Sequence, residues 1–225
     1  MKKIVKFVVL FLLCFVLFSC NKSDETKEVP EEYYSLIFDD YKSFVSNICS
    51  DEFEDYINNQ VPVEWFEMSI DARHGIATIT EKNFGYSLTD INRDGTQELI
   101  FIRDDYFVLA IYTIKDGNPY LLDAFNYKHN GMVLKDGCVF STMNGGDNYI
   151  EYRVQTLEKE HLTLKTVCEF GMNYDLGYYL KDKDSKIKAI TEEEFLSILS
   201  DYPDLEGGDI KQYLIECGID FCPVF

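Results

Sequence analysis

Apolar residues recur with a helical period at both ends of the polar part of the chain. Between residues 34 and 48 they lie three or four positions apart, which predicts an amphipathic helix of about four turns. Acidic residues suited to a first helical turn favour a second short helix at 50–57. Near the C-terminus, Thr191-Glu192-Glu193-Glu194 has the spacing of a capping box, and residues 209–218 predict a further helix that Gly218 ends. We therefore expect the domain to begin and end with helices.

Short β-branched and aromatic runs fill the middle of the chain, and most are separated by turn signals such as Asp116-Gly117, Asp136-Gly137 and Asn144-Gly145-Gly146. The predicted strands are 76–80, 86–89, 98–103, 106–115, 120–125, 132–134, 139–142, 149–157 and 161–168. Their close spacing, with no helical stretch between them, favours an antiparallel meander over βαβ units. Leu99 to Ile102 is apolar on both faces, which indicates a central strand. The predicted fold class is α+β, with N-terminal helices, a central antiparallel β-meander sheet and C-terminal helices packed on that sheet.

The first twenty residues have the pattern of an export signal. Three lysines precede an apolar run from Phe7 to Phe18, and the chain turns abruptly polar after Ser19-Cys20. The run is too short to cross a bilayer core of about 30 Å. The sequence therefore predicts export rather than a membrane span.

This leader resembles a bacterial lipoprotein signal, in which the residue matching Cys20 is lipidated and becomes the mature N-terminus. An ordinary secretory peptide or an uncleaved anchor is the alternative. The resemblance implies a protein of the bacterial cell envelope, held by its lipid on the exported side of a membrane. It divides the chain into a signal peptide (1–19), a flexible tether (20–32) and a single globular domain (33–225).

Charge narrows the possible partners. Without the three lysines of the leader, 18 basic residues face 40 acidic ones, a net charge of about −22. Such a surface repels phosphate backbones and anionic headgroups, which argues against nucleic acid and against peripheral membrane binding. We expect contact with the membrane through the N-terminal lipid alone.

Seven cysteines are present, of which Cys14 lies in the leader and Cys20 is the predicted lipid site. The five that remain are an odd number, so at least one thiol is free. Cys217 and Cys222 form the only close pair; they are a possible disulfide, and two separate buried thiols are the alternative. The chain has no C-x-x-C pair and its three histidines are scattered, which argues against a zinc site.

One internal loop carries specific chemistry. Asp90, Asn92 and Asp94 place oxygen side chains at alternate positions, Gly95 permits a sharp turn, and the Thr96 carbonyl and Glu98 side chain can add further oxygens. Hard oxygen donors in a flexible loop favour Ca²⁺ over Mg²⁺. The first half resembles the calcium loops of EF-hands and dockerins. Phe101 stands where an EF-hand has its bidentate glutamate, so we expect weak affinity and a structural ion. A polar hairpin whose side chains bond their own backbone is the alternative.

A broader resemblance covers about residues 30–202. It is carried by Phe84 to Asp90, Glu98 to Phe101, Ile111-Tyr112, Lys115-Asp116-Gly117, Asn144-Gly145-Gly146, Tyr178-Tyr179 and Thr191 to Phe195. These segments are similar to a group of uncharacterised bacterial surface lipoproteins with a D-x-N-x-D-G-x-x-E-L loop. No activity comes with this resemblance.

Catalytic motifs are absent from the sequence, including the nucleophile elbow, the Walker loop and H-E-x-x-H. Cys49 and His74 could be a thiol nucleophile and its base, but a pair of this kind is expected by chance among five thiols and three histidines. The aromatic pairs are interpreted as core rather than as glycan-stacking residues; they are Tyr33-Tyr34, Tyr106-Phe107 and Tyr178-Tyr179. The sequence favours a non-enzymatic, lipid-anchored domain that binds an extracellular protein or glycan. The alternative is an envelope hydrolase acting on glycan or peptide material. A cleft with paired titratable residues would favour the hydrolase.

Overall fold

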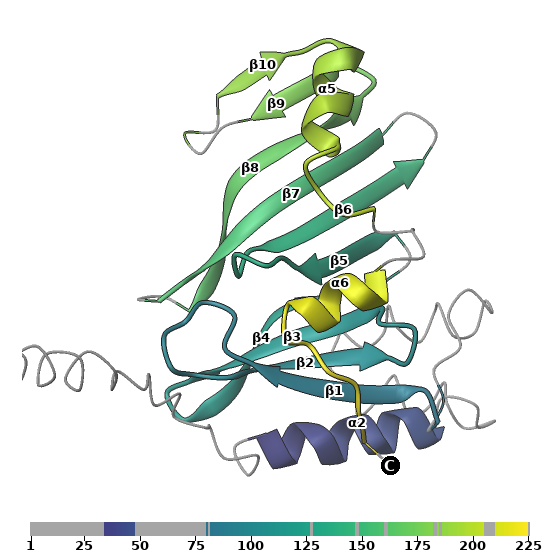
Figure 1. Cartoon of the computed structure of the whole chain (residues 1–225), viewed down its shortest axis with the longest axis vertical. Coiled ribbons are helices and arrows are strands. Elements are labelled where there is room, and N and C mark those ends of the chain that lie inside the picture. Colours follow the sequence, from purple (N-terminus) through teal and green to yellow (C-terminus); the bar gives the residue numbers. More distant parts are fainter. Residues whose placement is uncertain are drawn as a thin grey trace, which may run out of the picture.

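Two antiparallel sheets make up most of the protein in a computed structural model of the chain (Figure 1). The structure describes residues 34–47, 80, 82–126, 128–146, 149–159, 162–181, 184, 186–204 and 210–224. The five-stranded sheet, sheet A, has the strand order β11-β1-β2-β3-β4, and the six-stranded sheet, sheet B, has the order β10-β9-β8-β7-β6-β5. Within each sheet, strands that are consecutive in the chain pair with one another, and β11 returns to the edge beside β1.

Sheet A contains β1 (Phe84–Thr89), β2 (Glu98–Arg103), β3 (Val108–Lys115), β4 (Asn118–Ala124) and β11 (Cys222–Pro223). Sheet B contains β5 (His129–Val133), β6 (Val139–Gly146), β7 (Tyr149–Glu158), β8 (Thr163–Asn173), β9 (Gly177–Lys181) and β10 (Ile187–Ala189). The helices among the described residues are α2 (Ser35–Asn47), α5 (Glu192–Leu199) and α6 (Ile210–Glu216).

Sheet A is buried on both faces, which explains the continuous apolar run of β2. Because successive side chains alternate between faces, Leu99 and Phe101 point to one side and Ile100 and Ile102 to the other. The first pair packs with Tyr41 and other buried residues of α2. The ring centroids of Tyr41 and Phe101 lie 3.9 Å apart. The second pair belongs to a separate cluster on the opposite face. The predictions of a helix near 34–48 and of a central strand at 98–103 are confirmed.

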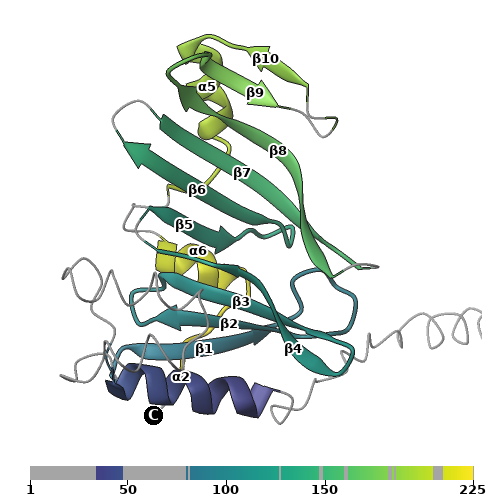
Figure 2. The ribbon, with the colours of Figure 1, turned by 180° about the vertical axis from the view of Figure 1, so that it is seen from behind.

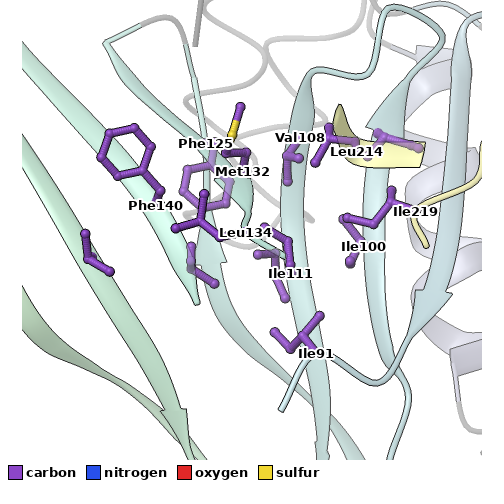
Figure 3. Close-up of a cluster of buried hydrophobic side chains, with 14 of the residues drawn as sticks. Ile91, Ile100, Val108, Ile111, Phe125, Met132, Leu134, Phe140, Leu214 and Ile219 are labelled. Carbon is purple, nitrogen blue, oxygen red and sulfur yellow. The ribbon is translucent and has the colours of Figure 1, made fainter. Parts of the chain in front are cut away.

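The second cluster joins the two sheets into one core (Figure 3). Phe125, Met132 and Leu134 lie between Phe140 of sheet B and Ile111 of sheet A, and Ile100 lies farther along the same cluster. Leu214 of α6 and the nearby Ile219 complete this core, and both are fully buried. Burying apolar surface of this extent is the main stabilising contribution available to the fold.

Helix α5 covers one face of sheet B, which we name the inner face (Figure 1). Phe195 of α5 packs against Phe170, and Tyr202 lies almost parallel to Phe140 at 4.7 Å between ring centroids. The opposite, outer face carries no helix among the described residues (Figure 2). Sheet B therefore presents two different surfaces.

The predicted fold class is wrong. Instead of one central sheet between terminal helices, the protein is mostly β, with two sheets and short helices on their faces. The chain leaves sheet A after β4 through a tight turn, in which the Asn126 N–H donates to the His129 carbonyl at 2.8 Å. Such a turn looks in sequence like any hairpin, so the strand pattern did not reveal that a second sheet begins there. The short strands β9, β10 and β11 were also not predicted.

Several local predictions are confirmed. Thr191 and Glu194 form both bonds of the capping box that begins α5. Gly218 ends α6 at φ 82°, with the Ile219 N–H donating to Leu214 and the Gly218 N–H to Ile215. Asp116-Gly117 closes the β3–β4 hairpin with positive φ at both residues.

Some sequence predictions lie outside the described residues. They are the signal peptide, the tether with Cys20, the helix at 50–57, the pair Cys49 and His74, and all but the last residue of the strand at 76–80. In the described part of the chain, no helix is both long and apolar enough to cross a membrane.

Candidate functional site

The loop between β1 and β2 brings together the predicted oxygen donors at positions one, three and five. Asp90 accepts from the Asp94 N–H at 3.1 Å and from the Gly95 N–H at 2.8 Å. Asn92 accepts from the same Asp94 N–H at 3.0 Å, and Asp94 accepts from the Thr96 N–H at 2.8 Å. Arg93 and Gly95 adopt positive φ, which curls the loop inward. The three side chains therefore converge, and their oxygens are held by the backbone of the loop itself.

Glu98 lies beneath this loop and is fully buried. Its carboxylate accepts from the Ile91 N–H at 2.9 Å and from the Thr113 hydroxyl at 3.1 Å. Burial raises the pKa of Glu98 to about 8, with Asp94 and Asp90 adding to the shift and the two hydrogen bonds opposing it. A negative charge at Glu98 is thus unfavourable unless a cation comes near it.

The donor set fits a hard cation, although it is not a closed site. Two carboxylates and an amide oxygen line the loop, and none of Asp90, Asp94 and Glu98 forms an ion pair with a basic side chain among the described residues. Over the same residues, no three acidic, histidine or cysteine side chains are close enough to form a ready-made metal centre. Occupation by Ca²⁺ therefore stays a prediction.

The loop is also a junction between parts of the fold. The Tyr34 hydroxyl at the start of α2 donates to the Gln97 carbonyl at 2.7 Å. On the side of sheet B, Gly137 of the β5–β6 hairpin lies so close to the Ile91 carbonyl that a side chain there would clash, and Lys159 donates to the Arg93 carbonyl at 3.3 Å. Stiffening this loop would hold α2, sheet A and sheet B together.

A cavity of about 500 Å³ lies on the inner face of sheet B, beside the end of α5. Its floor includes one cross-strand row, in which Asn130 of β5, Thr142 of β6 and Tyr152 of β7 are direct neighbours. Its polar lining residues are Lys128, Asn130, Thr142, Asn144, Ser200 and Asp204, and its apolar ones are Ile150, Tyr152, Leu196, Leu199, Tyr202 and Pro203. A volume of this size falls in the range of about 300–1,000 Å³ that is common for small-molecule sites.

One polar atom of the cavity lining is unsatisfied. Thr142 Oγ1 is buried and has no hydrogen-bond partner among the described residues. An unsatisfied buried hydroxyl costs about 1–3 kcal/mol, so native proteins seldom retain one without a reason. A ligand group in the cavity is one way to satisfy it.

The outer face of sheet B carries a cluster of charged side chains, which we name the outer-face cluster: Glu151, Arg153, Glu169, Tyr179 and Lys181. The two glutamates are buried, Arg153 pairs with both, and Lys181 lies 3.1 Å from Glu169. Gly171 stands between Glu151 and Tyr179 in the ladder, and the Tyr179 hydroxyl donates to Glu151 at 3.2 Å. Burial and the neighbouring carboxylates raise the pKa of Tyr179. The cluster contains two acids and two bases, so it neutralises its own charge.

The carboxylate pair and the cavity lie on opposite faces of the same sheet. Glu151 and Arg153 alternate with Tyr152 along β7, and Glu169 precedes Phe170 on β8. A second partly buried acid–base pair is Asp123 and His129, 3.8 Å apart, where burial raises the pKa of Asp123 and His129 opposes the shift. Neither pair lines the cavity.

Three of the described cysteines are in surroundings that disfavour the thiolate. Burial raises the pKa of the Cys138, Cys168 and Cys217 thiols, which lowers their nucleophilicity. Cys217 follows α6, Cys222 lies on β11, and both are thiols in this structure. The Cys217–Cys222 disulfide stays a prediction.

One member of each aromatic pair is a core residue, as interpreted from the sequence, and Phe107 and Tyr178 are partly buried against the core. Tyr34, Tyr106 and Tyr179 are all nearly inaccessible to solvent. The aromatic residues that line the cavity, Tyr152 and Tyr202, were not identified in advance. Alternation along β7 could have placed Tyr152 opposite its charged neighbours, but no local signal shows that residues 196–204 fold over it.

No protein-family model, curated protein or solved structure matches this chain.

Proposed function

We propose that the chain is an exported, lipid-anchored domain that binds a small ligand in the cavity of sheet B, with Ca²⁺ as a structural ion in the 90–98 loop. The observation that carries the proposal is the cavity, which combines aromatic, amide and hydroxyl groups with an unsatisfied buried oxygen at Thr142. Concave sites with a few placed polar groups are typical of ligand binding.

Binding is favoured over hydrolysis because the titratable pairs are elsewhere. A hydrolase that acts on glycans needs two carboxylates on either side of the bond to be cleaved. Asp204 is the only acidic residue among those that line the cavity. Glu151 and Glu169 on the outer face are engaged by Arg153 and Lys181.

The calcium part of the proposal rests on the loop. Asp90, Asn92, Asp94, the Thr96 carbonyl and Glu98 would hold the ion. Its charge would balance the carboxylates of Asp90, Asp94 and Glu98, which form no ion pair with a basic side chain among the described residues. Because the loop contacts α2, sheet A and sheet B, the ion would stabilise the position of the two sheets rather than act on a ligand.

The anchor rests on the order of charge, apolar run, serine and cysteine before the domain. Replacing Cys20 by alanine should abolish partitioning of the protein into a detergent phase and leave the unprocessed precursor. A variant that still matures and stays bound to membranes would contradict lipidation.

The binding function is tested by closing the cavity. Asn144 is exposed at its rim, so Asn144→Trp should fill the opening without disturbing the core, and Asn118→Trp on sheet A is the matched control. Ligand-observed NMR with a library of small polar fragments should detect binding to the wild type and to Asn118→Trp, and much weaker binding to Asn144→Trp. Bound fragments should stay chemically unchanged. Equal binding to Asn144→Trp would contradict a role for the cavity, and steady conversion of a fragment would favour the hydrolase.

A further inference from the structure

We infer that the ligand of the cavity is a neutral sugar ring, either a single sugar or one unit of a glycan. This inference rests on the proposed function and specifies the chemistry of its ligand. It follows from the charge of the lining, from the kinds of polar group present and from the arrangement of the aromatic rings.

The charge of the lining points to a neutral ligand. Among the described residues that line the cavity, Lys128 is the one basic residue and Asp204 the one acidic residue, so their formal charges cancel. The chain as a whole carries a net charge of −19, which disfavours the approach of anions. An anionic ligand would need a cluster of basic side chains, and the described part of the lining contains only Lys128.

The polar groups suit a ligand that both donates and accepts hydrogen bonds. Amides and hydroxyls line the cavity at Asn130, Asn144, Thr142 and Ser200. The Asn144 amide oxygen accepts from the Gly146 N–H at 3.1 Å, which fixes the amide and turns its NH₂ donors to the other side. Sugar hydroxyls pair with such groups in either direction, whereas an acyl chain would bury these polar groups without adding any hydrogen bond to them and would leave the Thr142 hydroxyl unsatisfied.

The aromatic residues provide the apolar surface that a sugar ring also needs. Tyr152 and Tyr202 both line the cavity, and neighbouring rings hold them in place. The Tyr152 ring lies nearly parallel to that of Phe170 at 5.2 Å, and Tyr202 lies nearly parallel to Phe140 at 4.7 Å. A pyranose ring has one face of C–H groups that packs on an aromatic ring and an edge of hydroxyls that bind amides. A lining that is half aromatic or aliphatic and half polar matches this division.

Thr142 links these features. It stands between Asn130 and Tyr152 in the same cross-strand row, and its buried hydroxyl lacks a partner among the described residues. The hydroxyl oxygen has almost no accessible surface, so the Thr142 side chain would turn about χ1 for a sugar hydroxyl above Tyr152 to supply that partner. Asn130 and Thr142 would then bind the polar edge of the sugar, and Tyr152 would contact its apolar face.

The test uses the full chain purified in detergent and saturation-transfer NMR with three panels of probes. The first contains glucose, galactose, mannose, N-acetylglucosamine and their disaccharides; the second contains nucleosides, and the third amino acids. Thr142→Val removes only the hydroxyl and should fold at least as stably as the wild type, because no protein bond is lost. Thr166→Val on β8, away from the cavity lining, is the matched control.

We expect at least one neutral sugar to bind, with affinity reduced about tenfold in Thr142→Val, the loss of about one hydrogen bond. Affinity should be unchanged in Thr166→Val and insensitive to salt. Equal sugar binding by Thr142→Val and wild type would place the sugar elsewhere and overturn the inference. Binding of nucleosides or amino acids but not sugars, weakened in Thr142→Val, would overturn the sugar assignment and leave the cavity as a binding site. Binding from none of the panels would contradict both the inference and the proposed function.

Discussion

The loop at 90–98 and the outer-face cluster both bury carboxylates, but they differ in how the negative charge is balanced. In the outer-face cluster, Arg153 and Lys181 lie against Glu151 and Glu169. In the loop, Glu98 is fully buried near Asp90 and Asp94, and none of the three has a basic partner among the described residues. A buried charge is tolerated only when it is paired, neutralised by protonation or bound to a cation.

The comparison shows where an external ion is needed. The cluster is electrically complete, so added Ca²⁺ has little to contribute there. The loop has either to keep a proton on Glu98 or to take up a cation. Raising the pH or adding Ca²⁺ should therefore change the stability of the protein through the loop and not through the cluster. Removing a basic side chain should lower the stability through the cluster.

The largest expected effect is a dependence of stability on pH that comes from Glu98. Its folded-state pKa of about 8 lies above the ordinary value of 4.5, so the folded state binds the proton more tightly than the unfolded chain. The stabilisation is complete below pH 4.5 and is lost as pH rises toward 8. With a chelator present, the unfolding free energy should fall on the order of 4 kcal/mol between pH 5 and 8 through this group alone, at about 1.4 kcal/mol for each pKa unit.

Glu98→Gln isolates this contribution. The amide can accept from the Ile91 N–H and donate to the Thr113 hydroxyl, so both hydrogen bonds of Glu98 can be retained. Chemical denaturation at several pH values should give a flatter profile for the variant than for the wild type. Identical profiles would mean that Glu98 is ionised in the folded protein without help from a cation.

A somewhat smaller effect is expected at the outer-face cluster. Arg153→Met should lower the unfolding free energy at neutral pH by about 3 kcal/mol, because it leaves the buried Glu151 without its cation. Arg103→Met is the matched control: Arg103 pairs with the exposed Asp105, and such pairs are worth about 1 kcal/mol or less. Denaturant titration of the two variants makes the comparison. A loss at Arg153 no larger than that at Arg103 would show that the cluster does not depend on its internal cation.

The smallest effect concerns Tyr179, which donates to Glu151 and lies 3.5 Å from Glu169. Tyr179→Phe removes one hydroxyl from a cluster that keeps its charges balanced, so the expected loss is about 1 kcal/mol. Thermal unfolding should show a modest decrease in Tm. A loss as large as that of Arg153→Met would mean that hydrogen bonding, rather than charge pairing, stabilises the cluster.

Local features of the fold were predictable, whereas its long-range arrangement was not. The periodicity of α2, the capping box at Thr191 and the double apolar face of β2 depend on neighbouring residues, and each was predicted from the sequence. The start of a second sheet near Asn126 depends on how the chain packs after the turn, which the sequence of the turn does not specify.

The candidate sites divide in the same way. The donors of the 90–98 loop lie within nine residues, so their convergence followed from spacing alone. The full burial of Glu98 did not, because it depends on Thr113 of β3 and on the packing of sheet A. The cavity joins residues of β5 to β7 with residues 196–204, and only the folded chain brings these together.

Calcium binding by the loop tests the central claim of this account most directly. If the loop takes up Ca²⁺ with a Kd on the order of 10⁻⁴ M, about 10 mM Ca²⁺ should raise the unfolding free energy by about 2.7 kcal/mol. Asp94→Ala should lose most of this gain, whereas Asp175→Ala, in the exposed β8–β9 turn, should keep it. Mg²⁺ should stabilise less, because the loop does not enforce an octahedron. An equal gain in wild type and Asp94→Ala would show that the acidic surface binds Ca²⁺ diffusely and that the loop is only a hairpin.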